Sequence, residues 1–327
     1  MHLDPFELHQ PTTVDEAVRI AREFAGACDY LAGGTDLLPN YKMHINLRPH
    51  LVALDRVEEL AGHSATHLGA MERLARLEED PSFVARYPGV ADALTEIATP
   101  LVRSSGTVGG NLLVETRCFF FNQSYFWRAS LGFCLKADGD KCHVVPQKER
   151  CYATFSGDLA PALLTLDATV EVAGPDGRRT IPLTELYDAG GDGIHRLRLA
   201  PGELVVGVDL PRAAAGLKGR YKKLRVRPSF DFPELGVAVA GRWDASGVER
   251  LRLAVGGVET YPRRFDELTD GVVGGPLTEA KIERLAEEVT RRLRPVHNTF
   301  LLPDYRRRMI GVYVRRALAE ATEGTAA

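Results

Sequence analysis

Two glycine pairs, each beside threonine and a second polar residue, are the feature of this sequence that most restricts its fold. The first pair lies within Leu31-Ala32-Gly33-Gly34-Thr35-Asp36-Leu37, and the second within Thr107-Val108-Gly109-Gly110-Asn111. Glycines at the end of a strand let backbone N–H groups approach a phosphate, because no Cβ intervenes and positive φ is allowed. Neither run matches the Walker loop or G-x-G-x-x-G, so the two common nucleotide-binding fingerprints are excluded. One such pair alone predicts only a tight turn, whereas two predict loops that hold one elongated ligand.

Hydrophobic periodicity predicts the elements around these turns. Residues 13–25 have capping-box spacing at Thr13 and Glu16 and an apolar stripe that ends at Gly26, which indicates a helix. A strand through Tyr30 and Leu31 leads into the first turn. The remaining expectations are strands over 51–54, 168–173, 179–182, 203–210, 220–227, 235–243 and 248–255, and helices over 72–79, 90–97, 278–293 and 303–321.

Strands followed by helices, rather than strict alternation, predict an α+β C-terminal domain. The small, alanine-rich stretch 211–216 is the expected domain boundary, which divides the chain into 1–216 and 217–327.

Composition excludes several classes of protein. The 327 residues include 41 Lys and Arg against 44 Asp and Glu, a net charge of −3, which argues against a dedicated nucleic-acid binder. No run approaches the roughly 20 apolar residues that a membrane helix needs. Residues 1–10 show no basic region followed by an apolar stretch, so no signal peptide is expected and we predict a cytoplasmic protein.

The cysteines are unevenly distributed. The five are Cys28, Cys118, Cys134, Cys142 and Cys151, and the last four fall within 118–151. In a reducing compartment, clustered thiols favour metal binding over disulfides. No C-x-x-C pair is present, so the zinc-ribbon and bacterial ferredoxin spacings do not apply. Buried metal-free thiols and a structural zinc therefore remain alternatives to an iron–sulfur cluster.

The segment that contains these cysteines has two further properties. Residues 119–133 include seven aromatic side chains, which predicts that the segment packs rather than being disordered. Residues 117–151 hold six lysines and arginines against three acids, a surplus that would offset the negative charge of a four-thiolate cluster. A segment this long without clear periodicity needs an internal staple to stay ordered, and a metal centre would supply one.

The paired glycine turns resemble those of the flavoprotein subunits of the xanthine dehydrogenase and carbon monoxide dehydrogenase family, in which both loops hold FAD. The resemblance also covers Ser156-Gly157-Asp158-Leu159-Ala160-Pro161, Tyr221-Lys222-Lys223 and Tyr305-Arg306-Arg307-Arg308-Met309, so it extends over nearly the whole chain. It implies a two-part FAD-binding domain and a C-terminal α+β domain. The FAD-binding residues that it implies are Leu31, Ala32, Gly33, Gly34, Thr35, Asp36, Leu37, Thr99, Thr107, Gly109, Gly110, Asn111, Asp158 and Lys223.

Two of these assignments have alternatives. Asp158 precedes an apolar stretch and could instead be a helix N-cap. Lys222 would point to the opposite face of a strand and could replace Lys223 as the flavin-side lysine. The arginine cluster at 306–308 is expected to be a solvated helix face or a subunit contact.

Ordinary family members have only a few residues between Asn111 and Ser156, whereas 44 stand here. This insertion, residues 112–155, resembles one in a branch of the family whose flavoprotein subunit carries an additional [4Fe–4S] cluster. The segments that carry the resemblance are Thr116-Arg117-Cys118, Asn122-Gln123-Ser124, 139–144 and 150–154. It implies that Cys118, Cys134, Cys142 and Cys151 together bind one [4Fe–4S] cluster, and that Cys28 does not. His143 is expected to donate a hydrogen bond near the cluster rather than to bind metal.

The resemblance implies an electron-transfer subunit. Reductive removal of a hydroxyl from an aromatic CoA thioester would occur at molybdenum in a partner subunit, and no catalytic acid, base or nucleophile is expected here. Electrons would pass between the [4Fe–4S] cluster, FAD and [2Fe–2S] centres of a small partner subunit, with ferredoxin as a candidate donor. The alternatives are a flavin subunit of another molybdenum hydroxylase and a zinc-stapled, non-catalytic binding subunit.

Overall fold

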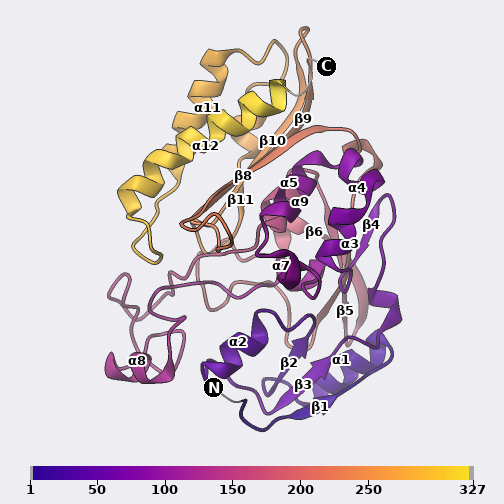
Figure 1. Ribbon diagram of the computed structural model, residues 1–327, viewed down its shortest axis with the longest axis vertical. Coiled ribbons are helices and arrows are strands. Elements are labelled where there is room, and N and C mark those ends of the chain that lie inside the picture. Colours follow the sequence, from indigo (N-terminus) through magenta and orange to yellow (C-terminus); the bar gives the residue numbers. More distant parts are fainter. Residues whose placement is uncertain (1–2, 324–327) are drawn as a thin grey trace.

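Three β-sheets organise residues 3–323, which the computed structural model describes (Figure 1). The first sheet is parallel, in the order β1-β3-β2 (Glu7–His9, His50–Ala53, Cys28–Leu31). The second is antiparallel, in the order β4-β7-β5-β6 (His67–Gly69, Leu204–Asp209, Thr169–Gly174, Gly177–Pro182). The third is also antiparallel, in the order β11-β10-β9-β8 (Arg263–Arg264, Val248–Gly256, Leu235–Trp243, Lys218–Leu224). Every predicted strand is confirmed within a few residues, whereas β1, β4 and β11 were not predicted.

The helix α1 (Val14–Glu23) covers the parallel sheet. Its N-cap is Thr13, whose side chain accepts a hydrogen bond from the backbone N–H of Glu16 at 3.2 Å, as the capping spacing predicted. The buried stripe of Val14, Ala17 and Val18 packs with residues of β3, β5 and β7 in one apolar cluster. The strand β2 ends at Leu31, so the first glycine turn leaves the carboxyl edge of this sheet and leads into α2 (Leu37–Lys42).

Short helices fill the middle of the chain: α3 (Leu74–Glu79), α4 (Pro81–Arg86), α5 (Pro88–Glu96), α6 (Pro100–Arg103), α7 (Val108–Leu112), α8 (Tyr125–Ser130) and α9 (Leu159–Leu164). Three of them, α4, α5 and α6, begin with proline, whose fixed φ and missing N–H suit the first helical position. The predictions for 72–79 and 90–97 are confirmed as α3 and α5. The short 3₁₀ helices are η1 (Glu58–Leu60), η2 (Leu183–Glu185) and η3 (Arg212–Ala214).

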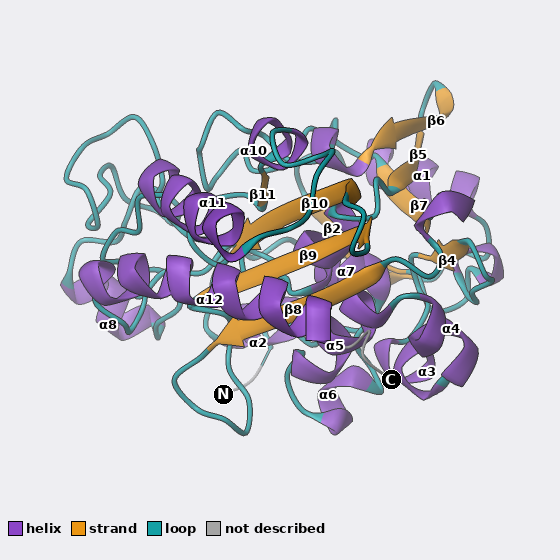
Figure 2. Cartoon of the chain, turned by 90° about the horizontal axis from the view of Figure 1, so that it is seen from above, coloured by secondary structure: helices purple, strands orange, loops and turns teal. Residues whose placement is uncertain are grey.

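The C-terminal sheet is enclosed by helices on both faces. In β9 the side chains alternate: Val237 and Val239 join the cluster with α11 and α12, whereas Ala238 joins the cluster with α5 and α9. The helices on the outer face are α10 (Asp266–Asp270), α11 (Glu279–Arg292) and α12 (Pro303–Glu323). Figure 2 shows α11 and α12 lying across β8, β9 and β10. No helix within residues 3–323 is both long and apolar enough to span a membrane.

One arginine of α12 corrects an expectation. Arg306 is fully buried, and its guanidinium donates hydrogen bonds to the carbonyl oxygens of Glu234 (3.0 Å) and Val296 (3.1 Å). It also bonds the side chain of Asn298 at 3.0 Å. The cluster at 306–308 is therefore not wholly solvated, because its first member fastens α12 to the loop that precedes it.

Candidate functional site

A cavity of about 390 Å³ lies between the two glycine turns. Its walls include most of the residues implied by the resemblance: Ala32, Gly33, Gly34, Thr35, Asp36, Leu37, Thr107, Gly109, Gly110 and Asn111. Leu31, Thr99, Asp158 and Lys223 are not among its lining residues. The structure thus brings together two segments that are far apart in sequence around one space.

The first turn offers hydrogen-bond donors. Within the described residues, the backbone N–H groups of Gly33, Gly34, Thr35 and Asp36 donate no hydrogen bond to protein. Gly34 has φ of +70°, a conformation that an L-residue rarely adopts. Consecutive free N–H groups on a turn with a left-handed residue form an anion-binding concavity, which suits a phosphate or pyrophosphate.

Gly33 brings the first turn against the segment that leads to the second. A Cβ at this position would lie 1.9 Å from the carbonyl oxygen of Ser105 and 3.2 Å from the Cα of Gly106. Both neighbours are backbone atoms, which a side-chain rotation cannot remove. Only glycine therefore allows this approach of the two segments.

The second turn differs from the first because its donors are already used. Gly109 donates its N–H to the carbonyl of Ala70 at 2.8 Å, and Gly110 donates to the side chain of Thr107 at 3.1 Å. The side chain of Asn111 accepts a hydrogen bond from the N–H of Leu159 at 3.0 Å. This turn consequently supplies a close, rigid wall, whereas the first turn supplies the free donors.

Two polar residues that the sequence did not single out also line the cavity. Asn40, on α2, and Arg196, in the loop before β7, each have a buried polar atom without a hydrogen-bond partner among the described residues: Oδ1 and Nη1, respectively. Buried polar atoms normally have a hydrogen-bond partner, so atoms that lack one beside a cavity indicate a ligand that binds there. The residues present therefore fit a large polar group such as FAD. No motif surrounds Arg196, so it could not be recognised as a candidate from sequence alone.

Asp158 and Lys223 lie together in a separate buried cluster. The ammonium of Lys223 is 3.0 Å from Oδ2 of Asp158, and the hydroxyl of Tyr221 donates to Oδ1 at 2.6 Å. Burial raises the pKa of Asp158, and Lys223 and Tyr221 partly offset this effect. Asp158 stands at the N-cap position of α9, as the alternative expected, but its carboxylate makes no capping hydrogen bond and is bonded to Tyr221 and Lys223 instead. Lys222 points away and pairs with Glu320 instead.

We expect replacement of Lys223 by methionine to lower the free energy of unfolding by about 3 kcal/mol, because the Asp158 carboxylate would remain buried without its cation. The adjacent change Lys222→Met is the matched control. Its ion pair is 31% and 41% exposed, so its loss should cost less than about 1 kcal/mol. Urea unfolding of both variants measures the difference. Equal effects of the two substitutions would show that the buried pair contributes no special stability.

The four clustered cysteines form a second, smaller pocket. Cys118, Cys134, Cys142 and Cys151 are each at most 8% exposed and line a common cavity together with Lys136 and His143. All four are free thiols, and Cys28 lies elsewhere, on β2. Burial raises the pKa of Cys118 to about 12 and that of Cys151 to about 11. Nε2 of His143 donates a hydrogen bond to the carbonyl oxygen of Phe133, beside the pocket.

The insertion packs on the flavin-binding half of the chain. Its helix α8 carries Arg128, a fully buried side chain that donates to the carbonyl oxygens of Met43 and His44, both at 2.8 Å. Phe121 is also buried, in a small apolar cluster with Ile45 and three of the cysteines. Not every aromatic side chain of the insertion is buried, since Phe126 remains 85% exposed.

Three charged side chains in contact connect the cysteine pocket to the large cavity. Lys136, which lines the cysteine pocket, donates to Oε1 of Glu115 at 2.7 Å, and Glu115 lines the large cavity. Arg196 donates to the same oxygen at 2.8 Å. Burial raises the pKa of Glu115, but the two cations more than offset this, so its pKa lies well below the ordinary value. The carboxylate is thus shared between the two sites.

Comparisons with known proteins agree with this geometry. The profile of the FAD binding domain in molybdopterin dehydrogenase matches residues 4–213. The chain belongs to this family. The profile of the CO dehydrogenase flavoprotein C-terminal domain matches residues 220–321.

Among the family's members, the aldehyde oxidoreductase FAD-binding subunit PaoB of Escherichia coli K12 is 35% identical to this chain over 273 residues, which is 80% of this chain and 84% of that one. The carbon monoxide dehydrogenase medium chain of Hydrogenophaga pseudoflava is 28% identical, over 97% and 96% of the two chains. A solved structure of carbon monoxide dehydrogenase from that organism superposes with a TM-score of 0.79 at 27% identity and covers 99% of both chains.

Membership of the family confirms the predicted fold and enzyme class. The chain has the two-domain, mixed α+β architecture of the carbon monoxide dehydrogenase medium chain. It is a flavin subunit of a molybdenum hydroxylase family oxidoreductase. The large cavity between the glycine turns lies wholly within the part of the chain that the FAD-binding profile covers, apart from Phe232.

Proposed function

We propose that this subunit carries two redox groups, FAD in the large cavity and a [4Fe–4S] cluster on Cys118, Cys134, Cys142 and Cys151. The observation that carries the proposal is the position of Glu115 and Lys136, which place one ion pair between the two sites (2.7 Å). When bound, the two groups supply electron transfer with the centres of partner subunits. This chain's residues hold and tune them.

For FAD, the free N–H groups at 33–36 would hold the pyrophosphate and the second turn would form the opposite wall. Arg196 and Asn40 would satisfy further polar atoms through Nη1 and Oδ1. Leu31, Thr99, Asp158 and Lys223 remain proposed contacts on the strength of the resemblance alone. Asp36 ties the first turn to the insertion, because its carboxylate accepts from the N–H of Glu115 at 3.2 Å and pairs with Arg117.

For the cysteines, the spacing of the sulfur atoms favours a cluster over zinc. One tetrahedral Zn²⁺ with bonds of about 2.3 Å holds its four sulfurs about 3.8 Å apart. Within residues 3–323, no three of the cysteine sulfurs lie within 4.8 Å of one another. A cluster in which each iron takes a different thiolate does not need its sulfurs this close together. The ammonium of Lys136 also lies 4.8 Å from the Phe121 ring at this pocket, and its charge offsets that of thiolates.

For the reaction, we infer reductive dehydroxylation of 4-hydroxybenzoyl-CoA to benzoyl-CoA at molybdenum in a partner subunit. The support is the resemblance of the insertion segments to those of the 4-hydroxybenzoyl-CoA reductase flavoprotein subunit. The 35% identity to PaoB favours a second candidate, a flavin subunit of an aldehyde-oxidising molybdenum hydroxylase. A zinc-stapled binding subunit is the third, which the sulfur spacing disfavours.

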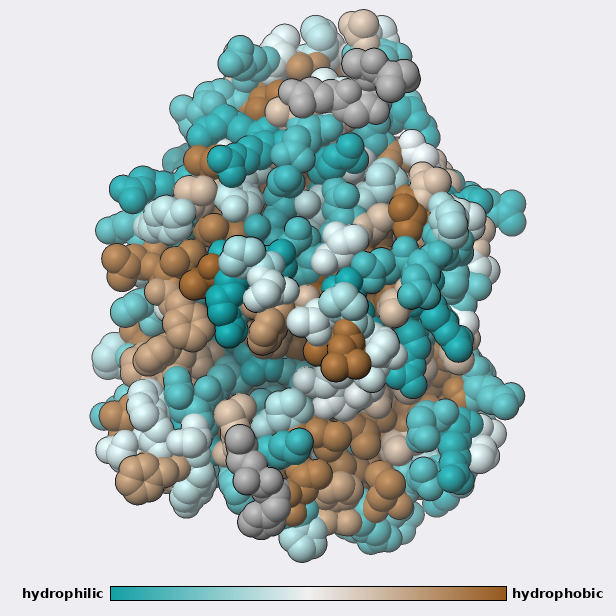
Figure 3. Space-filling view, viewed as in Figure 1, coloured by the Kyte–Doolittle hydropathy of each residue, from teal (hydrophilic) through white to brown (hydrophobic). Residues whose placement is uncertain are grey.

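Partner subunits are inferred as well: a molybdenum-containing catalytic subunit and a small [2Fe–2S] subunit, with ferredoxin as a candidate donor, all in the cytoplasm. Exposed apolar side chains support this inference. Phe300 and Leu302, before α12, are 71% and 63% exposed. Figure 3 shows apolar side chains gathered on the side of the molecule where α12 begins. Apolar patches of this kind commonly mark subunit contacts.

Purification of the tagged chain from its native host tests the proposal. We expect co-purification of a molybdenum subunit and a [2Fe–2S] subunit, with FAD and cluster iron assigned to this chain after the subunits are separated. Reduction should bleach both flavin and iron–sulfur absorption. Activity with 4-hydroxybenzoyl-CoA but not with aromatic aldehydes would support the first reaction, and the reverse would support the second. A flavin spectrum with one zinc and no iron per chain would overturn the cluster.

A further inference from the structure

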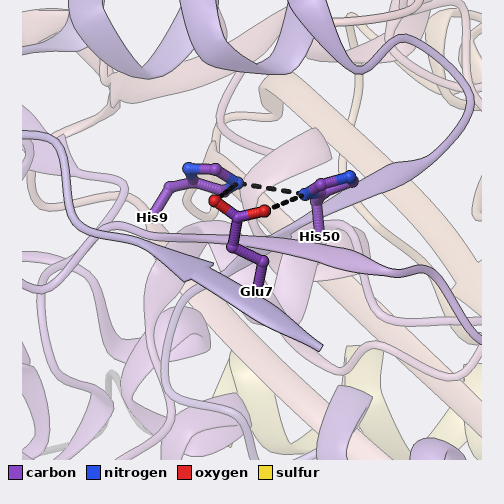
Figure 4. A group of neighbouring side chains, drawn as sticks. All are labelled: Glu7, His9 and His50. Carbon is purple, nitrogen blue, oxygen red and sulfur yellow. Dashed lines mark hydrogen bonds and ion pairs between the residues drawn. The ribbon is translucent and has the colours of Figure 1, made fainter. Parts of the chain in front are cut away.

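Two histidines and a glutamate converge at the edge of the parallel sheet, and none of the three lines either of the sites described above. Glu7 and His9 lie two residues apart on the edge strand β1, so they point to the same face of the sheet. His50 opens β3 and is paired in register with Glu7. Figure 4 shows the three side chains turned toward one another above the two strands.

The three ligand atoms already have the spacing of a metal site. Nε2 of His9 lies 3.2 Å from Nδ1 of His50, and the carboxylate oxygens of Glu7 lie 3.9 Å from the first and 3.4 Å from the second. A tetrahedral Zn²⁺ with bonds of about 2.0–2.1 Å holds its ligand atoms about 3.3 Å apart. Within residues 3–323, no other three His, Cys, Asp or Glu residues bring ligand atoms so close together.

An aromatic side chain fixes the orientation of both imidazoles. The ring of Phe24, at the end of α1, stacks on His50 with centroids 3.8 Å apart and on His9 with centroids 5.1 Å apart. The histidine side chains are only 16% and 19% exposed, whereas that of Glu7 is 64% exposed. The site is therefore sheltered on the histidine side and open to solvent at the carboxylate, which gives an ion both rigid ligands and an entry path.

We propose that Glu7, His9 and His50 bind a divalent transition-metal ion, with Zn²⁺ the best match to two imidazoles and one carboxylate. Three protein ligands leave a fourth position for water. The ion would join the three-residue strand β1 to β3, whose other neighbour β2 leads into the first glycine turn. Its expected role is to clamp this edge of the flavin-binding half. This proposal does not depend on the function of the cysteine pocket.

The test uses the full protein with its flavin and iron loaded, stripped of loose metal with EDTA, and titrated with Zn²⁺ by calorimetry. We expect one zinc per chain and a rise in the thermal midpoint with zinc concentration. His9→Gln and His50→Gln should each weaken zinc binding at least 100-fold, and Glu7→Gln, a change of an exposed side chain, should weaken it about tenfold. His67→Gln is the matched control, because His67 pairs with Asp209 at 2.7 Å on a different sheet and should bind zinc as the unaltered chain does.

A crystal soaked in zinc and measured at the zinc absorption edge provides the second readout. An anomalous peak within bonding distance of the His9 and His50 rings supports the site. Because the crystal contains the unaltered protein, this result does not depend on how well the variants fold. No peak at this position, or undiminished binding by both His50→Gln and Glu7→Gln, overturns it. Flavin content is measured in parallel, and unchanged flavin in the variants shows that loss of zinc is local.

Discussion

Replacement of Gly33 by valine is expected to lower the flavin content of the protein at least tenfold. The new Cβ would lie 1.9 Å from the carbonyl oxygen of Ser105 and 2.8 Å from its carbonyl carbon. Because these are backbone atoms, the first turn and the segment before the second turn must move apart. That movement would separate the free N–H groups at 33–36 from the wall on the other side of the cavity. Flavin per chain, measured after dialysis against excess FAD, gives the result.

The control is the same glycine-to-valine change at a turn where the new side chain meets no other atom and lies away from the cavity. Gly26 has φ of +79° and no atom within 4 Å of an added Cβ, so Gly26→Val introduces strain alone. Gly110→Val gives an intermediate case, since its Cβ would lie 2.9 Å from the Thr107 hydroxyl, a side chain that can rotate. We expect flavin loss in the order Gly33, Gly110, Gly26. Full flavin in Gly33→Val, at unchanged thermal midpoint, would contradict the two-loop site.

The regular elements were predictable because local pattern and tertiary environment agree. In β9, alternate residues face two different apolar clusters, and the prediction for 235–243 matches the observed strand. The helix α1 begins where Thr13 caps it. In contrast, β1 and β4 have three residues each, which is too few to show the alternation of apolar and polar side chains that predicts a strand. They are strands only because β3 and β7 provide partners distant in sequence.

The functional residues were predictable only where they lie close together in one segment of the sequence. The glycine turns and the cysteines stand out in the sequence because each concentrates an unusual residue type within one short stretch. Arg196 and Glu115 do not, because their importance comes from contacts between loops 81 residues apart. The cluster of Glu7, His9 and His50 was missed for the same reason: two ligands are local, but the third comes from a strand 41 residues beyond His9. Long-range pairing of ordinary residues leaves no mark on a single sequence.

Replacement of any one of Cys118, Cys134, Cys142 and Cys151 by serine is expected to remove most of the cluster iron. Each thiol is at most 8% exposed at the common pocket, so no other cysteine can take its place. The loss should also loosen residues 112–155, since metal binding contributes folding energy to the segment that supplies the ligands. Iron per flavin and hydrogen exchange of these residues measure the two effects.

The flavin should persist in these variants, because the insertion is attached to the flavin-binding half by contacts that need no metal. Arg128 donates to the carbonyl oxygens of Met43 and His44, and Lys136 remains bonded to Glu115. Cys28→Ser is the control, because Cys28 lies on β2 and bonds the carbonyl of Ala21. It should retain all iron. Retention of full iron by Cys134→Ser and Cys142→Ser would contradict the proposed ligands, and so would iron loss from Cys28→Ser equal to theirs. Because the shared carboxylate of Glu115 links the two sites, loss of iron with flavin intact would also show that the flavin cavity holds its shape without the cluster.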